Sequence, residues 1–321
     1  MQPLRWGMIG CGAVTEVKSA PAYRMTEGFM LEGVMCRDLQ KAKAYAAQHA
    51  IPLVFDDAHS LITDPRIDAV YIATPPDSHA AYALMAAEAG KICSVEKPIT
   101  PDYASAREVV EAFETRELPL FVSYYRRSLP RFLEVKQWLD EGRIGTLRQV
   151  RWSLTRRPHP RDPESDHWRV DRRVARAGYF DDVGSHGIDL LIFLLGDIVR
   201  AEGFATNQQR RYSAADAITG CWEHVSGILG SGSWNFGCDR REDLVEIYGE
   251  RGKITFSVLD EAPLVCESET GTVVREIANP QNVQLYHVRN IARALRGEKV
   301  HPSTGRTALH TAWVMEQMTG G

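Results

Sequence analysis

The first 122 residues alternate between short apolar runs and segments with helical spacing, and this alternation restricts the fold more than any other feature. The apolar runs lie at residues 6–9, 31–36, 67–73, 92–95 and 118–122. Strands separated by helices of this length form parallel sheets with right-handed crossover connections. The sequence therefore predicts a doubly wound parallel sheet with helices on both faces.

The pattern changes after residue 122. Helical spacing appears at 129–140 and 183–195, and alternation with period two appears at 146–155. Between 199 and 277, strand-like runs are separated by glycines and acidic residues, which is typical of hairpin-linked antiparallel strands. The sequence thus predicts a second, α+β domain, with a final helix after Gly305.

Composition excludes several classes of function. A net charge of -4 over 321 residues gives no basic face for nucleic acid. The six cysteines have no C-x-x-C spacing, which argues against a zinc ribbon or a disulfide scaffold. No export signal opens the chain, and no apolar run approaches the roughly 20 residues of a membrane span. We therefore expect a cytoplasmic protein with no membrane partner.

Gly10-Cys11-Gly12 is similar to a dinucleotide-binding fingerprint, with Thr15 at the third small-residue position. Glycine makes up 25 of 321 residues, so about two Gly-x-Gly triplets are expected by chance, and two are present. The other triplet, at 230–232, lies in strand-like sequence. The first lies where a strand turns into a helix, where Gly12 would let the backbone approach a pyrophosphate. A plain strand-to-helix turn is the alternative.

The second predicted strand ends at Met35-Cys36-Arg37-Asp38. An acid that binds the ribose of NAD commonly follows this strand, and Cys36 stands in its place. The guanidinium of Arg37 could bind a 2′-phosphate, so NADP(H) is favoured and NAD(H) remains possible. Alternatively, Arg37 is a solvated loop residue and Asp38 caps the next helix.

Two places offer groups for moving a proton. Glu96-Lys97-Pro98 follows a strand, at the edge where doubly wound sheets bind ligands. Asp182 and His186 are one helical turn apart. Each place has a structural alternative. Lys97-Pro98 could be part of a surface loop, Asp182 could be a helix N-cap, and His186 could be a buried, hydrogen-bonded histidine. A metal site that adds Asp189 is a weaker alternative, because no second ligand cluster accompanies it, and we predict no metal.

These motifs occur in a fixed order that extends along nearly the whole chain. The set comprises Gly10-Cys11-Gly12, Ala73-Thr74-Pro75-Pro76 with His79, Glu96-Lys97-Pro98, Tyr125-Arg126-Arg127, the segment 182–186 and the segment 247–254. In this set and order, the chain resembles the Gfo/Idh/MocA family of NAD(P)-dependent oxidoreductases, which includes glucose-fructose oxidoreductase and inositol dehydrogenase.

The resemblance implies a role for several residues. Lys97 matches the family lysine between the nicotinamide ribose and the substrate hydroxyl, Asp182 matches the carboxylate that orients the reacting group, and His186 matches the proposed general acid/base. The implied cofactor-binding residues are Gly10, Cys11, Gly12, Ala13, Val14, Cys36, Arg37, Thr74, Pro75, His79, Glu96 and Lys97. The implied substrate-binding residues are Lys97, Tyr125, Arg126, Trp168, Arg169, Asp182 and His186.

The resemblance also implies the domain organisation. A dinucleotide-binding Rossmann domain covers residues 1–122, and a helix at 304–319 packs back on it. Residues 123–303 form a substrate-binding and oligomerisation domain on an open antiparallel sheet. We expect a homodimer or homotetramer that forms through this sheet.

Two departures from the family leave the substrate open. Position 125 is Tyr where many members have Asn, and Ala175 to Gly178 replaces a glycine-rich run. Residues 151–176 contain eight arginines against four acids, which could favour an anionic or strongly polar substrate or could be a solvated loop.

We expect a dehydrogenase or reductase that acts on a CH–OH group. It would transfer a hydride between a nicotinamide and a secondary alcohol or ketone of a sugar, cyclitol or related diol. The alternative is a dinucleotide-binding sensor or regulatory protein without turnover.

Overall fold

The computed structural model describes residues 2–160, 162 and 168–320. The chain divides into two compact units. The first comprises Met1–Ser128 and Pro280–Leu309, and the second comprises Leu129–Asn279 and His310–Gly321. Each unit has its own sheet.

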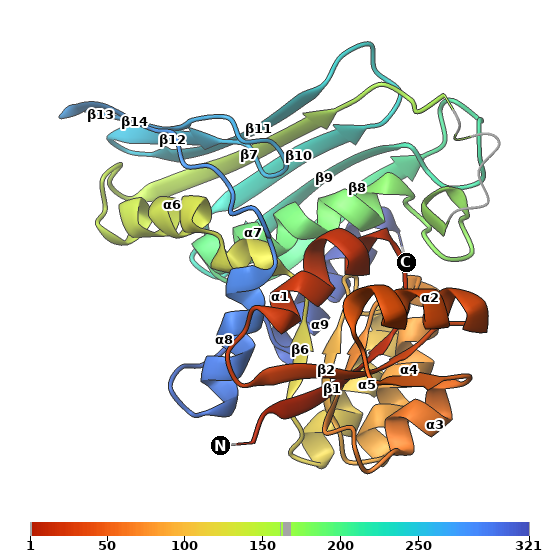
Figure 1. Ribbon diagram of the computed structural model, residues 1–321. Coiled ribbons are helices and arrows are strands. Elements are labelled where there is room, and N and C mark those ends of the chain that lie inside the picture. The colour runs from red at the N-terminus through yellow and green to blue at the C-terminus, as the bar shows by residue number, and fades with distance from the viewer. Residues whose placement is uncertain (1, 161, 163–167, 321) are drawn as a thin grey trace. The chain divides into compact units, whose positions relative to one another are not determined.

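The first unit is built on a six-stranded sheet in which every pairing is parallel. Its strands are β1 (Leu4–Ile9), β2 (Phe29–Met35), β3 (Leu53–Phe55), β4 (Ala69–Ile72), β5 (Ile92–Val95) and β6 (Leu120–Val122). Their order is β3-β2-β1-β4-β5-β6, so the sheet grows in opposite directions from β1 and β4. Strands β1 and β2 lie side by side in Figure 1. This order confirms the predicted doubly wound sheet.

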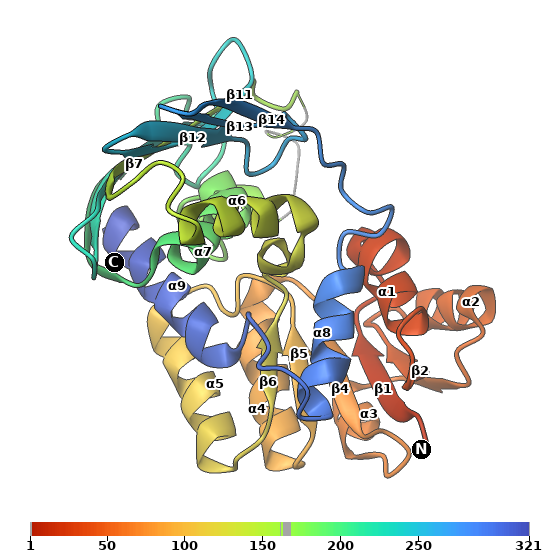
Figure 2. The same ribbon diagram turned by 90° about the vertical axis from the view of Figure 1, so that its left-hand side faces the viewer.

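Helices cover both faces of this sheet (Figure 2). They are η1 (Thr15–Ser19), α1 (Ala20–Arg24), α2 (Leu39–His49), α3 (Ala58–Thr63), α4 (His79–Glu88), α5 (Tyr103–Thr115) and α8 (Leu285–Leu295). The core between the sheet and α1, α2 and α8 includes Trp6, Tyr23, Tyr45 and Val288. The rings of Trp6 and Tyr23 meet edge to face, with centroids 4.7 Å apart.

Residues 280–309 belong to the first unit, whereas the sequence places residues up to 303 in the second domain. Val288 and Ile291 of α8 are fully buried in the core of the first unit. Beyond α8, the Ser303 hydroxyl donates to the Val122 carbonyl (2.7 Å), and Phe121 forms an antiparallel bridge with Thr304. Two forces therefore hold this segment: burial of one apolar helix face and hydrogen bonding to the edge strand β6.

The second unit is built on an eight-stranded sheet. Its strands are β7 (Leu147–Thr155), β8 (Ile198–Thr206), β9 (Ala217–His224), β10 (Leu229–Asn235), β11 (Glu242–Gly249), β12 (Gly252–Phe256), β13 (Leu264–Ser268) and β14 (Gly271–Arg275). The order is β14-β13-β12-β11-β7-β10-β9-β8. Strands β7 and β10 pair in parallel, and the other pairs among the described strands of this second sheet are antiparallel. The predicted antiparallel sheet is thus a mixed, mostly antiparallel one.

Helices α6 (Pro130–Asp140) and α7 (Ser185–Leu195) lie against one face of this sheet (Figure 2). A Cβ atom added to Gly187 would overlap the indole ring of Trp152, so α7 lies directly on the central strand. Helix α9 (Gly305–Thr319) begins in the first unit. From His310 onward it belongs to the second, where the Thr311 hydroxyl donates to Asp189 (3.0 Å).

The sequence, by contrast, assigns all of 304–319 to the first domain. A Cβ atom on Gly203 of β8 would overlap the backbone of Met318, so the end of α9 lies against this strand. Within the described part of the chain, no helix is long and apolar enough to cross a membrane.

Candidate functional site

The turn after β1 requires glycine at position 10. Gly10 has a φ of +113°, and its amide donates to the Met35 carbonyl of β2 (2.8 Å). A Cβ atom at this position would lie 2.6 Å from the Ala73 carbonyl oxygen, closer than the Cβ atoms of real side chains come to a neighbouring atom. The turn therefore depends on the absence of a side chain at Gly10, as the motif predicts.

Gly12 has open space around it instead. No atom lies within 4 Å of a Cβ atom added there. Helical backbone begins at Ala13 and Val14, and the first amides of a helix have no partner within the helix. The buried Thr15 hydroxyl donates to the Gly12 carbonyl (2.8 Å), so Thr15 fixes the turn from beneath. The open space at Gly12, directly before these amides in the chain, fits a pyrophosphate.

Cys11, which is part of this turn, has the thiol of Cys36 as a neighbour. Burial, together with the Cys36 thiol, raises the pKa of Cys11 to about 12, so Cys11 stays protonated. Beyond Cys36, Arg37 is exposed, whereas the Asp38 carboxylate caps α2 by accepting from the amides of Gln40 (3.0 Å) and Lys41 (3.1 Å). The end of β2 is therefore followed by an exposed cation, Arg37, and the carboxylate of the next residue, Asp38, is engaged as a helix cap.

The loop after β4 is held by His79. This side chain is fully buried, and its ring nitrogens lie 2.8 Å from the Thr74 carbonyl and 2.9 Å from the Pro98 carbonyl. Burial lowers the pKa of His79 below its ordinary value. His79 thus joins the loop of Thr74 and Pro75 to the loop after β5, and its ring nitrogens contact the protein itself.

Glu96 lies at the centre of a buried hydrogen-bond network. Its Oε1 atom accepts from the Tyr71 hydroxyl (2.6 Å) and from the Gln284 side-chain amide (2.8 Å). Its Oε2 atom accepts from the backbone amide of Lys97 (3.3 Å). The network connects β4, the loop after β5 and the start of α8, and so fixes the backbone that carries Lys97. Neither Tyr71 nor Gln284 was predicted to belong to the site.

Tyr125 and Arg126 follow β6 in a short 3-10 turn, η3 (Tyr125–Ser128), and both are buried. The Arg126 guanidinium lies 5.1 Å from the centre of the Tyr125 ring. The Lys18 ammonium of η1 lies 5.9 Å from the same centre. The first unit therefore gathers Lys18, Lys97 and Arg126 at the carboxyl ends of β1, β5 and β6.

In the second unit, the structure brings together three of the predicted residues. Asp182 lies in a π-helical turn, η6 (Phe180–Gly184), that leads into α7. The Arg169 guanidinium donates to the Asp182 carboxylate (2.6 Å) and lies 4.6 Å from the Trp168 ring centre. Arg169 thus orients the carboxylate of Asp182.

His186 is buried on the first turn of α7, and Asp189 is fully buried one turn further. Asp189 accepts the Thr311 hydroxyl described above. Across the residues that the structure describes, no group of three or more His, Cys, Asp or Glu side chains could hold a metal ion.

Asp181 has a perturbed pKa that sequence patterns did not single out. Burial raises the pKa of this carboxyl to about 7, against the opposing effect of a hydrogen bond from the Ala177 amide (2.8 Å). The neighbouring Asp182 carboxylate raises it further. Two adjacent aspartates therefore differ in character: Asp182 is paired with Arg169, whereas Asp181 titrates near neutrality.

The π-helical turns are a second feature that sequence patterns did not reveal. Along the described chain they occur at η1, which follows the glycine turn, and at η6, which carries Asp182. Such turns are rare and often found at functional sites. Part of the arginine-rich run, residues 161 and 163–167, lies outside the described residues.

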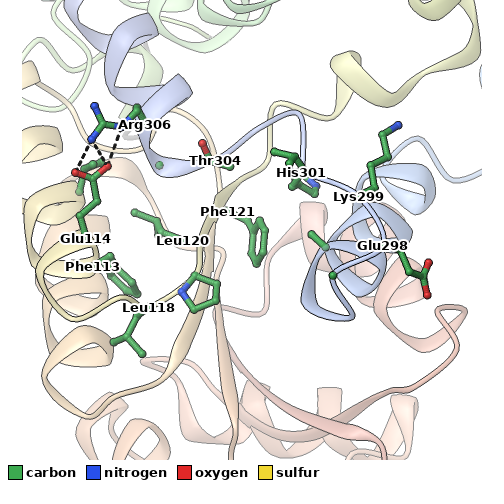
Figure 3. A pocket seen from close by; sticks show the side chains of 16 residues that line it. Phe113, Glu114, Leu118, Leu120, Phe121, Glu298, Lys299, His301, Thr304 and Arg306 are labelled. Atoms are coloured by element: carbon green, nitrogen blue, oxygen red, sulfur yellow. Dashed lines mark hydrogen bonds and ion pairs between the residues drawn. The ribbon is translucent and has the colours of Figure 1, made fainter.

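A cavity of about 650 Å³ lies elsewhere in the first unit (Figure 3). It is lined by apolar side chains that include Phe113, Leu120 and Phe121, and an ion pair between Glu114 and Arg306 (2.8 Å) stands at one end. The cavity is next to α5 and the start of β6, and it includes none of the predicted site residues.

Comparisons with known proteins match both units. A family model described as "Oxidoreductase family, NAD-binding Rossmann fold" matches residues 4–124. A second model, described as "GFO/IDH/MocA C-terminal domain", matches residues 132–255.

Oxidoreductase P35 of Formosa agariphila is 32% identical over 320 residues, which cover 99% of this chain and 98% of that protein. Myo-inositol 2-dehydrogenase of Thermotoga maritima is 26% identical over 277 residues, which cover 84% of this chain and 79% of that protein. A solved structure of levoglucosan dehydrogenase with NADH and levoglucosan superposes with a TM-score of 0.87 at 22% identity, covering 99% of this chain and 96% of that one.

Proposed function

The chain belongs to the Gfo/Idh/MocA family of oxidoreductases, and from this premise we propose that it transfers a hydride between a nicotinamide and a CH–OH group of a sugar, cyclitol or related diol. The observation that carries the proposal is the turn at Gly10 and Gly12, where no atom lies within 4 Å of a Cβ atom added to Gly12, directly before the first helical residues. The named relatives act on inositol and levoglucosan, which are both polyhydroxylated rings.

Three side chains carry the chemistry in this proposal. A bound nicotinamide accepts or supplies the hydride. Lys97 donates a hydrogen bond to the reacting oxygen, and His186 takes the hydroxyl proton during oxidation and returns it during reduction. Asp182, which is held by Arg169, orients the reacting group. The Glu96 network keeps the Lys97 backbone in place.

Two variants test these roles. We expect Lys97→Met and His186→Ala to bind NADPH within a few-fold of the unaltered protein and to lower turnover by roughly 10² or more. Cofactor titration and steady-state kinetics measure the two quantities separately. Unchanged turnover in His186→Ala would remove that residue from the mechanism.

We also propose a preference for NADP(H) over NAD(H). Arg37 is exposed just after β2, and the carboxylate of the next residue, Asp38, is engaged as a helix cap. Arg37→Ala should raise the KM for NADPH and leave that for NADH nearly unchanged. Equal effects on both cofactors would contradict a role for Arg37 in binding the 2′-phosphate.

A cofactor-binding sensor without turnover is the competing function. It predicts tight NADP(H) binding and no change in nicotinamide absorbance with any member of a broad panel of polyols and ketoses. Oxidation or reduction of one panel member would exclude it.

We further propose a cytoplasmic homodimer or homotetramer that forms through the second unit's sheet. The six cysteines are free thiols, as in a reducing compartment. In the second unit's sheet, strands β8 and β10 carry two large apolar side chains that are exposed, Phe204 (72% exposed) and Leu229 (57% exposed). Phe204→Asp should lower the molar mass measured by light scattering. An unchanged mass would place the subunit contact elsewhere.

A further inference from the structure

Two cysteines meet where the first two strands of the first unit end. Strands β1 and β2 run in parallel, with Ile9 paired to Met35, and the Gly10 amide donates to the Met35 carbonyl (2.8 Å). Cys36 follows this pair directly in the chain, and Cys11 follows two residues after Ile9. Adjacent strands lie about 4.8 Å apart, which is within the roughly 4.4–6.8 Å between Cα atoms that a disulfide requires. The strand pairing therefore brings the two cysteines within reach of a covalent bond.

The two side chains face one another. Cys11 is buried in the core of this unit, and Cys36 packs against the same core. Burial raises the pKa of Cys11 to about 12, and the Cys36 thiol adds to this effect through its charge and through a hydrogen bond between the two thiols. Strand pairing and the contact between the thiols thus agree.

The two thiols differ in their access to solvent. Cys11 is only 5% exposed, whereas Cys36 is half-buried at the end of β2, where its thiol donates to the Asp38 carbonyl (3.1 Å). A small oxidant in solution therefore reaches Cys36 first. Because burial keeps Cys11 protonated, its sulfur reacts only with a partner that is already beside it.

We propose that Cys11 and Cys36 form a reversible disulfide that lowers the affinity for the nicotinamide cofactor. Hydrogen peroxide, or another hydroperoxide, oxidises the Cys36 sulfur to a sulfenic acid, and hydrogen peroxide is reduced to water. The Cys11 sulfur then attacks the Cys36 sulfur, so that the S–S bond forms and the S–O bond breaks. The departing hydroxide takes the Cys11 proton and leaves as a second water. A dithiol reverses the modification by thiol–disulfide exchange.

The disulfide would act on the cofactor through the glycine turn. An S–S bond is about 2.05 Å long, shorter than any contact between unbonded sulfurs, so the two cysteines must draw together. Cys11 lies between Gly10, whose amide is held by Met35, and Gly12, where we place the pyrophosphate. A displaced Cys11 therefore moves the Gly12 side of the turn. The inference rests on the proposed function, because the ligand affected is the cofactor of that function.

Peptide mapping tests the bond itself. The protein is treated with hydrogen peroxide, its remaining thiols are blocked with iodoacetamide, and it is digested with trypsin. Cleavage after Lys and Arg leaves Cys11 in residues 6–18 and Cys36 in residues 25–37. We expect the two peptides to be joined, with a mass about 2 Da below their sum, and to separate in dithiothreitol. Oxidised Cys36 without a joined peptide would overturn the inference.

Cofactor titration tests the consequence, with matched cysteine variants. NADPH fluorescence gives the Kd before and after peroxide for the unaltered protein, Cys36→Ser and Cys221→Ser, whose substituted residue is an exposed cysteine on β9 of the second unit. Peroxide should raise the Kd at least about tenfold in the unaltered protein and in Cys221→Ser, and dithiothreitol should restore it. The Kd of Cys36→Ser should not respond. An equal rise in Cys36→Ser, or joined peptides with an unchanged Kd, would overturn the inference.

The two measurements separate this inference from the proposed function. Joined peptides in a protein whose reduced form binds neither NADPH nor NADH would support the disulfide and refute the oxidoreductase. Tight NADPH binding by the reduced protein, with no joined peptide after peroxide, would refute the disulfide and support the cofactor.

Discussion

Gly10→Ala and Gly12→Ala should have opposite consequences, although the two glycines are separated by one residue. At Gly10, φ is +113° and an added Cβ atom would lie 2.6 Å from the Ala73 carbonyl oxygen. At Gly12, φ lies outside the left-handed region and no atom lies within 4 Å of the added carbon. The first glycine is therefore required by the fold, and the second leaves room for a ligand.

The magnitudes follow from these contacts. A strained backbone costs roughly 1–3 kcal/mol, and the overlap with the Ala73 backbone adds to it, so Gly10→Ala should lower the free energy of unfolding by at least this amount. Gly12→Ala should leave that free energy unchanged or raise it by about 0.4–1 kcal/mol, because alanine restricts the unfolded chain. A methyl group where the pyrophosphate approaches should weaken NADPH binding at least about tenfold, or about 1.4 kcal/mol.

Urea denaturation and fluorescence titration with NADPH measure the two quantities on the same preparations. The reasoning is refuted if Gly12→Ala binds NADPH as tightly as the unaltered protein, since the dinucleotide would then not pass over Gly12. A marked loss of stability in Gly12→Ala would refute the open space itself.

Three further substitutions address the surrounding residues. Tyr71→Phe removes a hydrogen bond to the buried Glu96 and should lower the free energy of unfolding by about 1–3 kcal/mol in urea denaturation; an unchanged value would contradict the network. The Asp181 carboxyl has a folded pKa of about 7 against about 3.9 when unfolded, so stability should fall as pH rises from about 4 to 7. Asp181→Asn should lack this fall and melt at a higher temperature than the unaltered protein at pH 8, but not at pH 4; parallel profiles would show that Asp181 is not responsible. Arg169→Gln releases Asp182 and should lower kcat several-fold while leaving the KM for NADPH unchanged; a change in that KM alone would place Arg169 at the cofactor.

The fold of the first unit is readable from sequence where strands are long and apolar. The run at 67–73 and the glycine turn after residue 9 both correspond to observed features. The sequence patterns did not predict strand β3 or helix α3. These elements have three and six residues, which are too few to establish a period of hydrophobic residues. Helix α8 was not predicted although its apolar residues recur at helical spacing; what the sequence does not show is that Val288 and Ile291 pack in the core of the first unit, some 260 residues earlier in the chain.

The same distinction holds for the site. Contiguous motifs such as Glu96-Lys97-Pro98 are visible because their chemistry is local. The contacts that support these motifs are not visible in the sequence. Gln284 and Glu96 are 188 positions apart, and no pattern around Gln284 indicates that the two side chains form a hydrogen bond. The raised pKa of Asp181 is equally hidden, because desolvation depends on what surrounds the carboxyl in the folded chain.

The discontinuous make-up of the first unit has a consequence for biosynthesis. When Ser128 leaves the ribosome, the segment that begins at Pro280 has yet to be translated. At 5–20 residues per second, the nascent nucleotide-binding half waits roughly 8–30 s for its last layer. During that interval the surface later covered by Val288 and Ile291 faces solvent, a natural target for chaperones. A gene truncated after codon 128 should therefore yield an aggregation-prone fragment, not a transplantable nucleotide-binding cassette.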